Sequence, residues 1–112
     1  MVESFSKVTE GLYYVREDDQ ASQVAERVYG DVKKSNNLLR ANPSAWSAAE
    51  LIRVPGVQGR VANVRSGESS TSVIRRMFPG QPTHIYLDRF YSWNGGDSRV
   101  FAGGELVFVP ER

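Results

Sequence analysis

Apolar and polar positions along the first half of the chain switch from strand-like to helix-like spacing. Residues 12–16 are rich in β-forming side chains and predict a strand that ends at the polar cluster 17–19. Beyond this cluster, apolar residues fall at i, i+3, i+4 and i+7, the spacing of an amphipathic helix. They are Ala21, Val24, Ala25 and Val28. Asp19 is the expected N-cap of this helix, and Gly30 is its expected end.

A second helix and a returning strand complete this first segment. The helix is expected to be capped by Asp31 and to end at Asn42-Pro43, with Leu38 and Leu39 facing inward. Residues 51–55 combine β-branched residues with leucine and predict the strand.

The second half of the chain repeats this plan. Residues 61–65 predict a strand and residues 66–68 a turn, after which Ser69 or Ser70 caps a helix that ends at Pro79-Gly80. This helix is expected to bury Val73, Ile74 and Met77.

The fourth predicted helix carries a more aromatic face than its counterpart. Pro82 suits its first turn, and Leu87, Phe90 and Tyr91 are spaced to face inward. The Gly-rich residues 94–98 predict a loop. The β-type residues Val100, Phe101 and 106–109 follow around the turn Gly103-Gly104.

Matched residues indicate that the two halves are a tandem repeat. The segments 50–55 and 105–110 share Glu, Leu, Val and Pro at a distance of 55 residues, whereas Val15-Arg16 matches Val64-Arg65 at a distance of 49. The second copy is therefore expected to carry about six additional residues between its last helix and its last strand. A repeat of this length predicts that the same order of strands and helices occurs twice in the fold.

Composition narrows the classes of function. The chain has 112 residues, 40% of them hydrophobic, a formal net charge of +1 and no cysteine. A chain of this size forms one domain or two very small units that must pack together. Scattered arginines form no basic stripe for nucleic acid, and the missing cysteine excludes disulfides and thiolate chemistry. No apolar run reaches membrane-spanning length, so we expect neither a signal segment nor membrane insertion.

The order of elements and its landmark residues resemble the LysM domain, a small strand-helix-helix-strand module. The resemblance is carried by residues 14–19, 24–25, 29–30, 38–43 and 51–55, and again by 64–69, 73–74, 87 and 101–110. It implies an α+β fold of two tandem LysM-like (βααβ) units packed together, at residues 12–56 and 61–112, behind an N-terminal arm of residues 1–11. That arm either lies along a neighbouring protein or frays.

The resemblance also implies where binding takes place. In wall-binding LysM modules, a Gly-Asp-Thr/Ser turn and the loop before the last strand line a groove for N-acetylglucosamine chains. The corresponding turns here are Asp18-Asp19-Gln20 and Gly67-Glu68-Ser69, and neither is complete. Two aspartates suit an anionic wall poorly, which weakens the glycan interpretation. Adjacent acidic residues at a helix start also act as capping groups.

Two tryptophans are further candidates for contact with a partner or a glycan. Trp46 and Trp93 each follow the second helix of their unit, and tryptophan is enriched at interaction hot spots. The alternative is that each indole covers the open end of a small core. We favour this packing role for Trp46 and an interaction role for Trp93, which is expected to lie in the longer Gly-rich loop.

Catalysis finds little support in the sequence. The single histidine, His84, lies near a predicted helix start without a nucleophile beside it. Gly95-Gly96 and Gly103-Gly104 lack the Lys-Ser/Thr ending of a phosphate-binding loop. We therefore expect no catalytic residues, no metal and no cofactor.

A second resemblance concerns the biological setting. Residues 24–31 and 38–43 are similar to LysM-type modules of bacteriophage tail and baseplate proteins. This resemblance implies a non-enzymatic adaptor in the virion that is assembled in the host cytoplasm and docks to other tail proteins. Peptidoglycan binding is the alternative, and a cytosolic stress or envelope-associated module is a third possibility.

Overall fold

The computed structural model describes residues 5–44 and 46–112. Within these residues, groups of strands alternate with groups of helices along the chain, and the strands form two antiparallel sheets with the orders β1-β4-β5 and β2-β3. The predicted α+β class is confirmed. The division into two LysM-like units, with the boundaries given above, stays a prediction.

The first half of the fold runs from strand β2 to strand β3, which pair antiparallel. In chain order its elements are β2 (Gly11–Tyr14), α1 (Ala21–Tyr29), the 3-10 helix η1 (Val32–Lys34), α2 (Ser35–Ala41) and β3 (Leu51–Val54). Gly30 follows α1 with a φ of 73°, a left-handed conformation that glycine adopts without steric cost, so the predicted end of this helix is confirmed. Asp31 caps η1 by accepting a hydrogen bond from the Lys33 amide at 2.9 Å.

The second half runs from strand β4 to strand β5, which also pair antiparallel. Its elements are β4 (Gly59–Asn63), α3 (Ser70–Met77), α4 (Thr83–Trp93) and β5 (Leu106–Pro110). Ser69 caps α3 through its hydroxyl, which accepts from the Ser72 amide at 3.2 Å. The predicted cap is therefore confirmed, and so is the burial of the three apolar residues on α3.

Part of the predicted N-terminal arm is a strand of the second sheet. Strand β1 (Ser6–Val8) pairs antiparallel with β4 on the edge opposite to β5, with Ser6 facing Val61. Phe5 packs against the core of the second half, where its ring faces the guanidinium of Arg60 at 4.5 Å. The described residues of the arm thus bind within their own chain.

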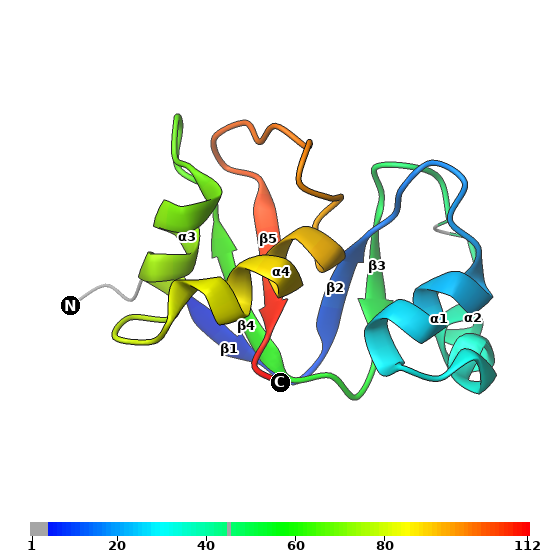
Figure 1. The fold of residues 1–112 in the computed structure, drawn as a ribbon. Coiled ribbons are helices and arrows are strands. Elements are labelled where there is room, and N and C mark those ends of the chain that lie inside the picture. The colour runs from blue at the N-terminus through cyan, green and yellow to red at the C-terminus, as the bar shows by residue number, and fades with distance from the viewer. Residues whose placement is uncertain (1–4, 45) are drawn as a thin grey trace.

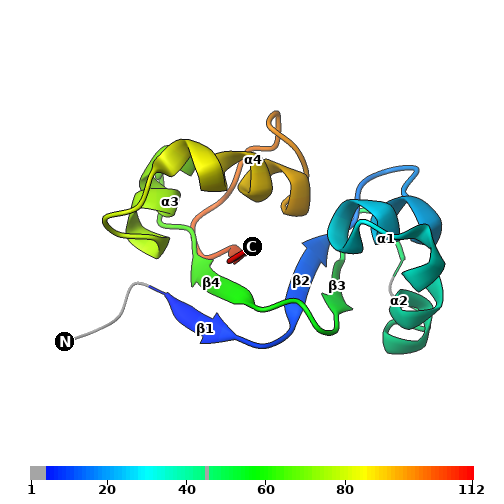
Figure 2. The ribbon, with the colours of Figure 1, turned by 60° about the horizontal axis from the view of Figure 1, so that its bottom comes forward.

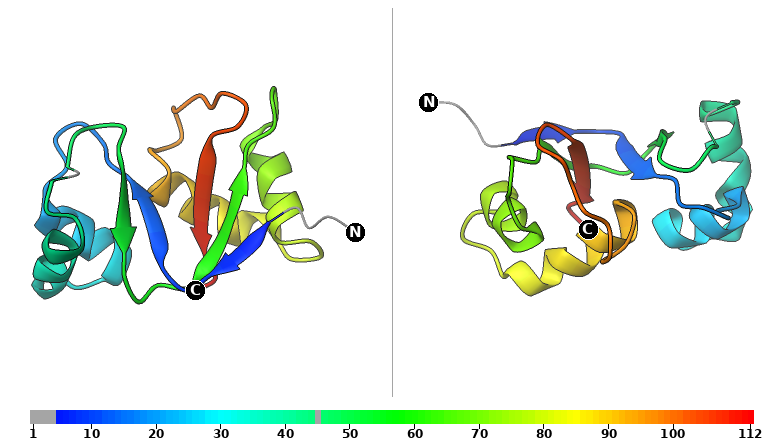
Figure 3. Two further views of the ribbon diagram at one scale, coloured as in Figure 1. Left: turned by 180° about the vertical axis from the view of Figure 1, so that it is seen from behind. Right: turned by 90° about the horizontal axis from the view of Figure 1, so that it is seen from above.

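The molecule is elongated, with extents of 39 × 24 × 24 Å. Helices α1 and α2 lie at one end and α3 at the other, and α4 runs from α3 across the strands toward β2 (Figures 1 and 2). Seen from above, the strands run along one side, and α3, α4 and α1 lie on the other (Figure 3). The helices thus lie along two separate sheets that are adjacent in space.

The two halves share buried aromatic residues. Trp93 from α4 and Phe108 from β5 belong to the core of the first half, where the Trp93 ring meets Tyr13 edge-on at 6.3 Å and Phe108 at 4.9 Å. Phe90, three positions before Trp93 on α4, and Val109, one position after Phe108 on β5, belong to the core of the second half. Elements α4 and β5 therefore join both cores into one packed body.

Gly11 is required at this junction. A Cβ atom at position 11 would lie 2.8 Å from the Trp93 ring and 3.1 Å from the Phe108 ring. Such distances are too short for carbon atoms, so the close approach of β2 to these rings depends on the missing side chain.

A buried asparagine after the second helix of each half ties that helix to the last strand. The Asn42 amide nitrogen donates to the carbonyls of Leu38 (3.0 Å) and Arg53 (2.7 Å), and its oxygen accepts from the Arg53 amide (2.8 Å). Asn94 makes the same three bonds with Phe90 and Phe108, at 2.8, 2.8 and 3.2 Å. Each asparagine replaces a neighbouring strand at the outer edge of β3 or β5, so the peptide groups there are satisfied.

These asparagines correct the predicted position of the extra residues. The asparagine and its strand partner are 11 residues apart in the first half and 14 apart in the second, which leaves about three additional residues in the last loop. The other three of the expected six lie before Asn94, where α4 (11 residues) is longer than α2 (7 residues). Helix length cannot be read from the matched motifs alone, which explains the error.

Three local predictions were wrong. Leu39 is 44% exposed on the outer face of α2, because only Leu38 of this pair points to the core. Val100 and Phe101 are not part of a strand, and Val100 is 89% exposed. The first strand of the second half begins at Gly59 rather than Val61, because Gly59 and Arg60 pair with both β1 and β5.

We expect Trp93→Ala to destabilise the whole protein by about 3–5 kcal/mol, because it leaves a cavity between the two cores. In urea unfolding of the wild type, both halves should lose structure in one transition, since the core of the first half is incomplete without Trp93 and Phe108. Trp46→Ala is the matched control: its ring is only half-buried, and its replacement should cost clearly less. Two separate transitions in the wild type would contradict a shared core.

Candidate interaction sites

The turn before α3 is organised around the carboxylate of Glu68. Its oxygens accept from the Arg65 amide (3.0 Å), from the Ser72 hydroxyl (3.0 Å) and from the Arg76 guanidinium (3.0 and 2.7 Å). The Glu68 side chain is 6% exposed and that of Arg76 11%. The hydrogen bonds from Arg76 are the main reason why the pKa of Glu68 falls from 4.5 to about 2.

The turn before α1 contains an equivalent arrangement around Asp19. Its carboxylate accepts from the Arg16 amide (2.8 Å), the Tyr13 hydroxyl (2.7 Å) and Arg27 (3.2 Å). Burial, together with the hydrogen bond to Asp19, raises the pKa of Tyr13 to about 12. Asp19 was predicted to be the N-cap of α1, which is wrong: Gln20 occupies that position, and its amide donates to the Gln23 side chain at 3.2 Å.

The residue before each of these carboxylates has a left-handed backbone. Gly67 has a φ of 74° and Asp18, at the matched position, a φ of 68°. Aspartate tolerates this region better than most residues, so Asp18 retains the turn geometry and places an exposed carboxylate at its tip. The two turns are therefore alike in shape and different in charge.

A shallow groove of about 470 Å³ lies beside the turn of the second half. One wall is the segment 67–71, and the other is the loop 99–101, with Tyr91 of α4 between them. The structure thus places Gly67, Glu68 and Ser69 together at one groove. Both charged side chains of the groove, Glu68 and Arg99, are already in ion pairs, so their charges are balanced within the protein.

Arg99 holds the loop that forms the second wall. Its guanidinium lies between the rings of Tyr14, at 3.5 Å, and Phe101, at 4.2 Å. It also donates to the Asn94 carbonyl (3.0 Å) and to Glu105 (2.9 Å), and its side chain is 12% exposed. Because Tyr14 belongs to the first half, this contact fixes the loop against the neighbouring half.

The two tryptophans do not occupy comparable places. Trp93 is the last residue of α4 and is 4% exposed, so its predicted loop position is wrong and its ring offers almost no surface to a partner. Trp46 is half-buried against the core of the first half, and its indole nitrogen donates to the Asn42 carbonyl at 2.8 Å. The packing interpretation preferred for Trp46 agrees with these contacts.

Sequence reasoning missed three groove residues. Tyr91 was predicted as a core residue of α4, whereas it is half-buried and lines the groove. Phe101 was predicted as a β-type residue, and Arg99, which follows the predicted loop 94–98, was given no role. A lone arginine between aromatic residues in a Gly-rich loop could have suggested a stacked guanidinium, but its second ring, Tyr14, is distant in sequence.

Other chemical sites were searched for in the described residues. No group of three or more acidic or histidine side chains there is placed to hold a metal ion. His84 is exposed in the first turn of α4. None of the helices in the described part of the chain is both long enough and apolar enough to span a membrane.

Comparison with known proteins gives no assignment. The chain matches no protein-family model and no curated protein sequence at a significant level. The LysM resemblance therefore stays an expectation from the sequence motifs.

The lowered pKa of Glu68 predicts a specific acid sensitivity. A carboxylate whose pKa is depressed in the folded state stabilises the protein fully above its unfolded pKa, near 4.5, and loses this contribution as the pH falls toward about 2. Glu68→Gln should lower the free energy of unfolding at pH 7 by roughly 2 kcal/mol. It should also flatten the fall in stability between these pH values in urea titrations.

Glu17→Gln is the matched control, because Glu17 is an exposed carboxylate next to the other turn. It should change neither the stability at neutral pH nor the slope in acid. An unchanged acid slope in Glu68→Gln would show that other carboxyl groups cause it.

Proposed function

We propose that this protein is a non-enzymatic structural adaptor of a bacteriophage tail or baseplate, or of a related injection device, which docks to other tail proteins through its two turn surfaces. The proposal starts from the sequence resemblance to LysM-type tail modules. The observation that carries it further is the shared core at Trp93 and Phe108, which makes both halves one rigid body.

Rigidity suits an adaptor for a physical reason. A part that sets the position of its neighbours must keep its docking surfaces at a fixed distance and angle. Here Arg16 of the first half donates to the carbonyls of Tyr91 and Ser92 at the end of α4, both at 3.0 Å, and Arg99 stacks on Tyr14. These contacts, added to the shared core, oppose movement of one half relative to the other.

The turns themselves favour protein docking over glycan binding. In each turn the carboxylate accepts a hydrogen bond from a backbone amide, that of Arg16 or Arg65. This amide is then not available to an acetamido group. The first turn also exposes Glu17 and Asp18, whose negative charges would be repelled by an anionic wall polymer. A basic surface on a neighbouring protein would be attracted by the same charges.

Peptidoglycan binding is the second candidate, and one observation favours it. The groove of the second half has aromatic side chains, Tyr91 and Phe101, beside hydroxyl groups on residues 69–71, and its charges are balanced. A neutral groove with aromatic and hydroxyl groups is compatible with a neutral sugar.

Sedimentation with insoluble peptidoglycan separates the two functions. We expect the adaptor to stay in the supernatant. If the groove binds glycan, the wild type should sediment and Gly67→Asp should not, because it adds a charge to the groove in a backbone conformation that Asp18 already adopts. Gly80→Asp is the matched control, since Gly80 also has a positive φ of 77° and has free space but lies outside the groove.

The virion assignment needs a direct test. An antibody raised against the protein should label the tail or baseplate of particles purified from the source culture, viewed by electron microscopy. Label on cell walls together with unlabelled particles would reject the adaptor and support peptidoglycan binding. Label on neither would reject both functions.

A further inference from the structure

One asparagine of the chain is followed by a residue that makes it prone to a spontaneous reaction. Asn94 is the only asparagine with a glycine after it. In such a pair the backbone nitrogen of the glycine can attack the side-chain carbonyl carbon of the asparagine, because glycine has no side chain to hinder the approach. The Asn94-Gly95 pair was predicted above to begin a loop, and neither candidate function uses its chemistry.

The reaction is a deamidation that needs only water. The Gly95 nitrogen loses its proton and bonds to Cγ of Asn94, while the bond from Cγ to Nδ2 breaks and Nδ2 leaves as ammonia. Water then opens the resulting cyclic imide at either of its two carbonyl carbons. One opening gives an aspartate, and the other gives an isoaspartate, in which the backbone passes through the side chain. In sum, the side-chain amide and water become a carboxylic acid and ammonia.

The folded protein holds Asn94 in a way that opposes this reaction. Asn94 is 1% exposed, and its Nδ2 group, which has to leave, donates to the carbonyls of Phe90 and Phe108, both at 2.8 Å. Its side-chain oxygen accepts from the Phe108 amide at 3.2 Å. These three bonds fix the side chain toward β5. Water, which has to exchange protons and open the imide, has almost no access to it.

Arg99 holds the loop that follows Asn94. Its guanidinium donates to the Asn94 carbonyl at 3.0 Å and lies 3.5 Å from the centre of the Tyr14 ring. Gly95 has a φ of 97°, and a Cβ atom there would lie 2.8 Å from Cδ of Arg99 and 3.0 Å from the Tyr14 ring. The packing of Arg99 therefore requires the same glycine that makes Asn94 reactive.

The matched asparagine of the first half does not share this weakness. Asn42 makes the same three hydrogen bonds, but the residue after it is Pro43. The backbone nitrogen of proline carries no hydrogen, so it cannot form the imide. The two halves thus contain the same structural asparagine with different chemical stability, and only that of the second half can be lost by this route.

We propose that Asn94 is a modification site whose reactivity the fold controls. It is unreactive while the loop 94–99 is closed, and it deamidates when this loop opens. The product cannot restore the closed state, because a carboxylate has no hydrogen to donate and repels the buried carbonyl oxygens of Phe90 and Phe108. The attachment of α4 to β5 is then lost permanently.

This loss reaches both halves of the protein. Arg99 and Phe101, in the loop after Asn94, line the groove, and Trp93, directly before Asn94, lies in the core of the first half. A chain that has opened and deamidated is therefore no longer able to keep its surfaces in place. The step limits the working life of the protein, whether its partner is a tail protein or a glycan.

Peptide mass spectrometry tests the proposal on the unmodified protein. The full-length wild type is kept at mildly alkaline pH, where the glycine nitrogen loses its proton more readily, in native buffer and in urea. Trypsin cleaves after arginine, so residues 90–99 form one peptide that contains Asn94. We expect the conversion of Asn94 to be at least about tenfold slower in native buffer than in urea, because only the open fraction reacts.

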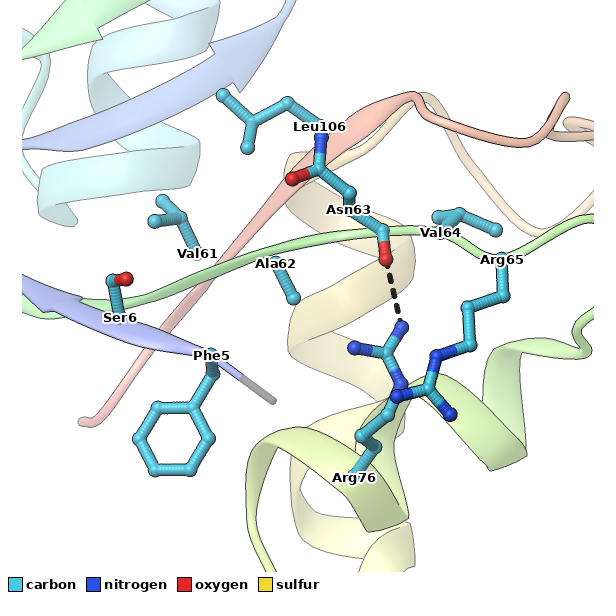
Figure 4. Close-up of a pocket in the computed structure, with 9 residues that line it drawn as sticks. All are labelled: Phe5, Ser6, Val61, Ala62, Asn63, Val64, Arg65, Arg76 and Leu106. Atoms are coloured by element: carbon cyan, nitrogen blue, oxygen red, sulfur yellow. Dashed lines mark hydrogen bonds between the residues drawn. The ribbon is translucent and has the colours of Figure 1, made fainter. Parts of the chain in front are cut away.

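Asn63 is the reference site within the same samples. It is exposed on β4, where its carbonyl accepts from Arg76 at 2.8 Å (Figure 4). The residue after it is Val64, whose branched side chain hinders attack by the backbone nitrogen. In urea, the conversion of Asn63 in peptide 61–65 should therefore be slower than that of Asn94, and Asn42 should not convert by this route.

Two variants test the role of the loop and the effect of the product. Arg99→Lys removes the stacked guanidinium and should speed the conversion of Asn94 in native buffer at least about threefold. Arg75→Lys changes an exposed arginine of α3 and should react like the wild type. Asn94→Asp carries the product from the start, so it should unfold at a lower urea concentration than the wild type or fail to fold.

Refolding measures whether the reaction is reversible for the structure. Wild type aged in urea at alkaline pH is diluted into native buffer, and the refolded fraction, followed by circular dichroism, should fall as the deamidated fraction rises. A sample aged in urea at mildly acidic pH, where the reaction is slow, is the control for other damage and should refold fully.

Four results would overturn the proposal. Equal conversion of Asn94 in native buffer and in urea would show that the fold does not protect it. Conversion in urea no faster than that of Asn63 would remove the role of the glycine. Refolding of the deamidated protein to wild-type stability would show that the product is tolerated. Equal acceleration by Arg99→Lys and by Trp46→Ala would assign the opening to the whole protein. None of these results depends on peptidoglycan sedimentation or on labelling of the virion.

Discussion

The packing of Trp93 and Phe108 into the core of the first half is the interaction on which the rest of this structure depends. Each half is too small to bury a large core alone, and these two aromatic rings from the second half complete the core of the first. Gly11 allows β2 to approach them closely. Because the rings come from α4 and β5, the same elements that build the second half also complete the first.

The polar contacts follow from this arrangement. A carboxylate in each turn, Asp19 or Glu68, binds the preceding backbone amide and an arginine on the following helix. A buried asparagine in each half, Asn42 or Asn94, then fastens the second helix to the last strand. These hydrogen bonds satisfy peptide groups at the edge of each small core. The halves can thus differ in surface charge while keeping the same internal bonds.

The exposed surfaces of the two halves differ in charge and in side-chain type. The first turn is acidic, whereas the groove of the second half is neutral and aromatic. A rigid frame with several different surfaces suits a part that joins neighbours. The same frame would also support a glycan groove, so the choice between these functions depends on the surfaces and not on the fold.

The sequence by itself determined the α+β class, the order of most helices and strands, and the position of both turns, because these depend on local spacing and on capping residues such as Ser69 and Gly30. It did not determine that Trp93 ends a helix and lies between the halves, that Leu39 faces outward, or that Arg99 stacks on Tyr14. These outcomes are set by contacts between residues far apart in the chain, which no local pattern encodes. Only the tertiary structure shows which side chains such contacts bury and which they leave for a partner.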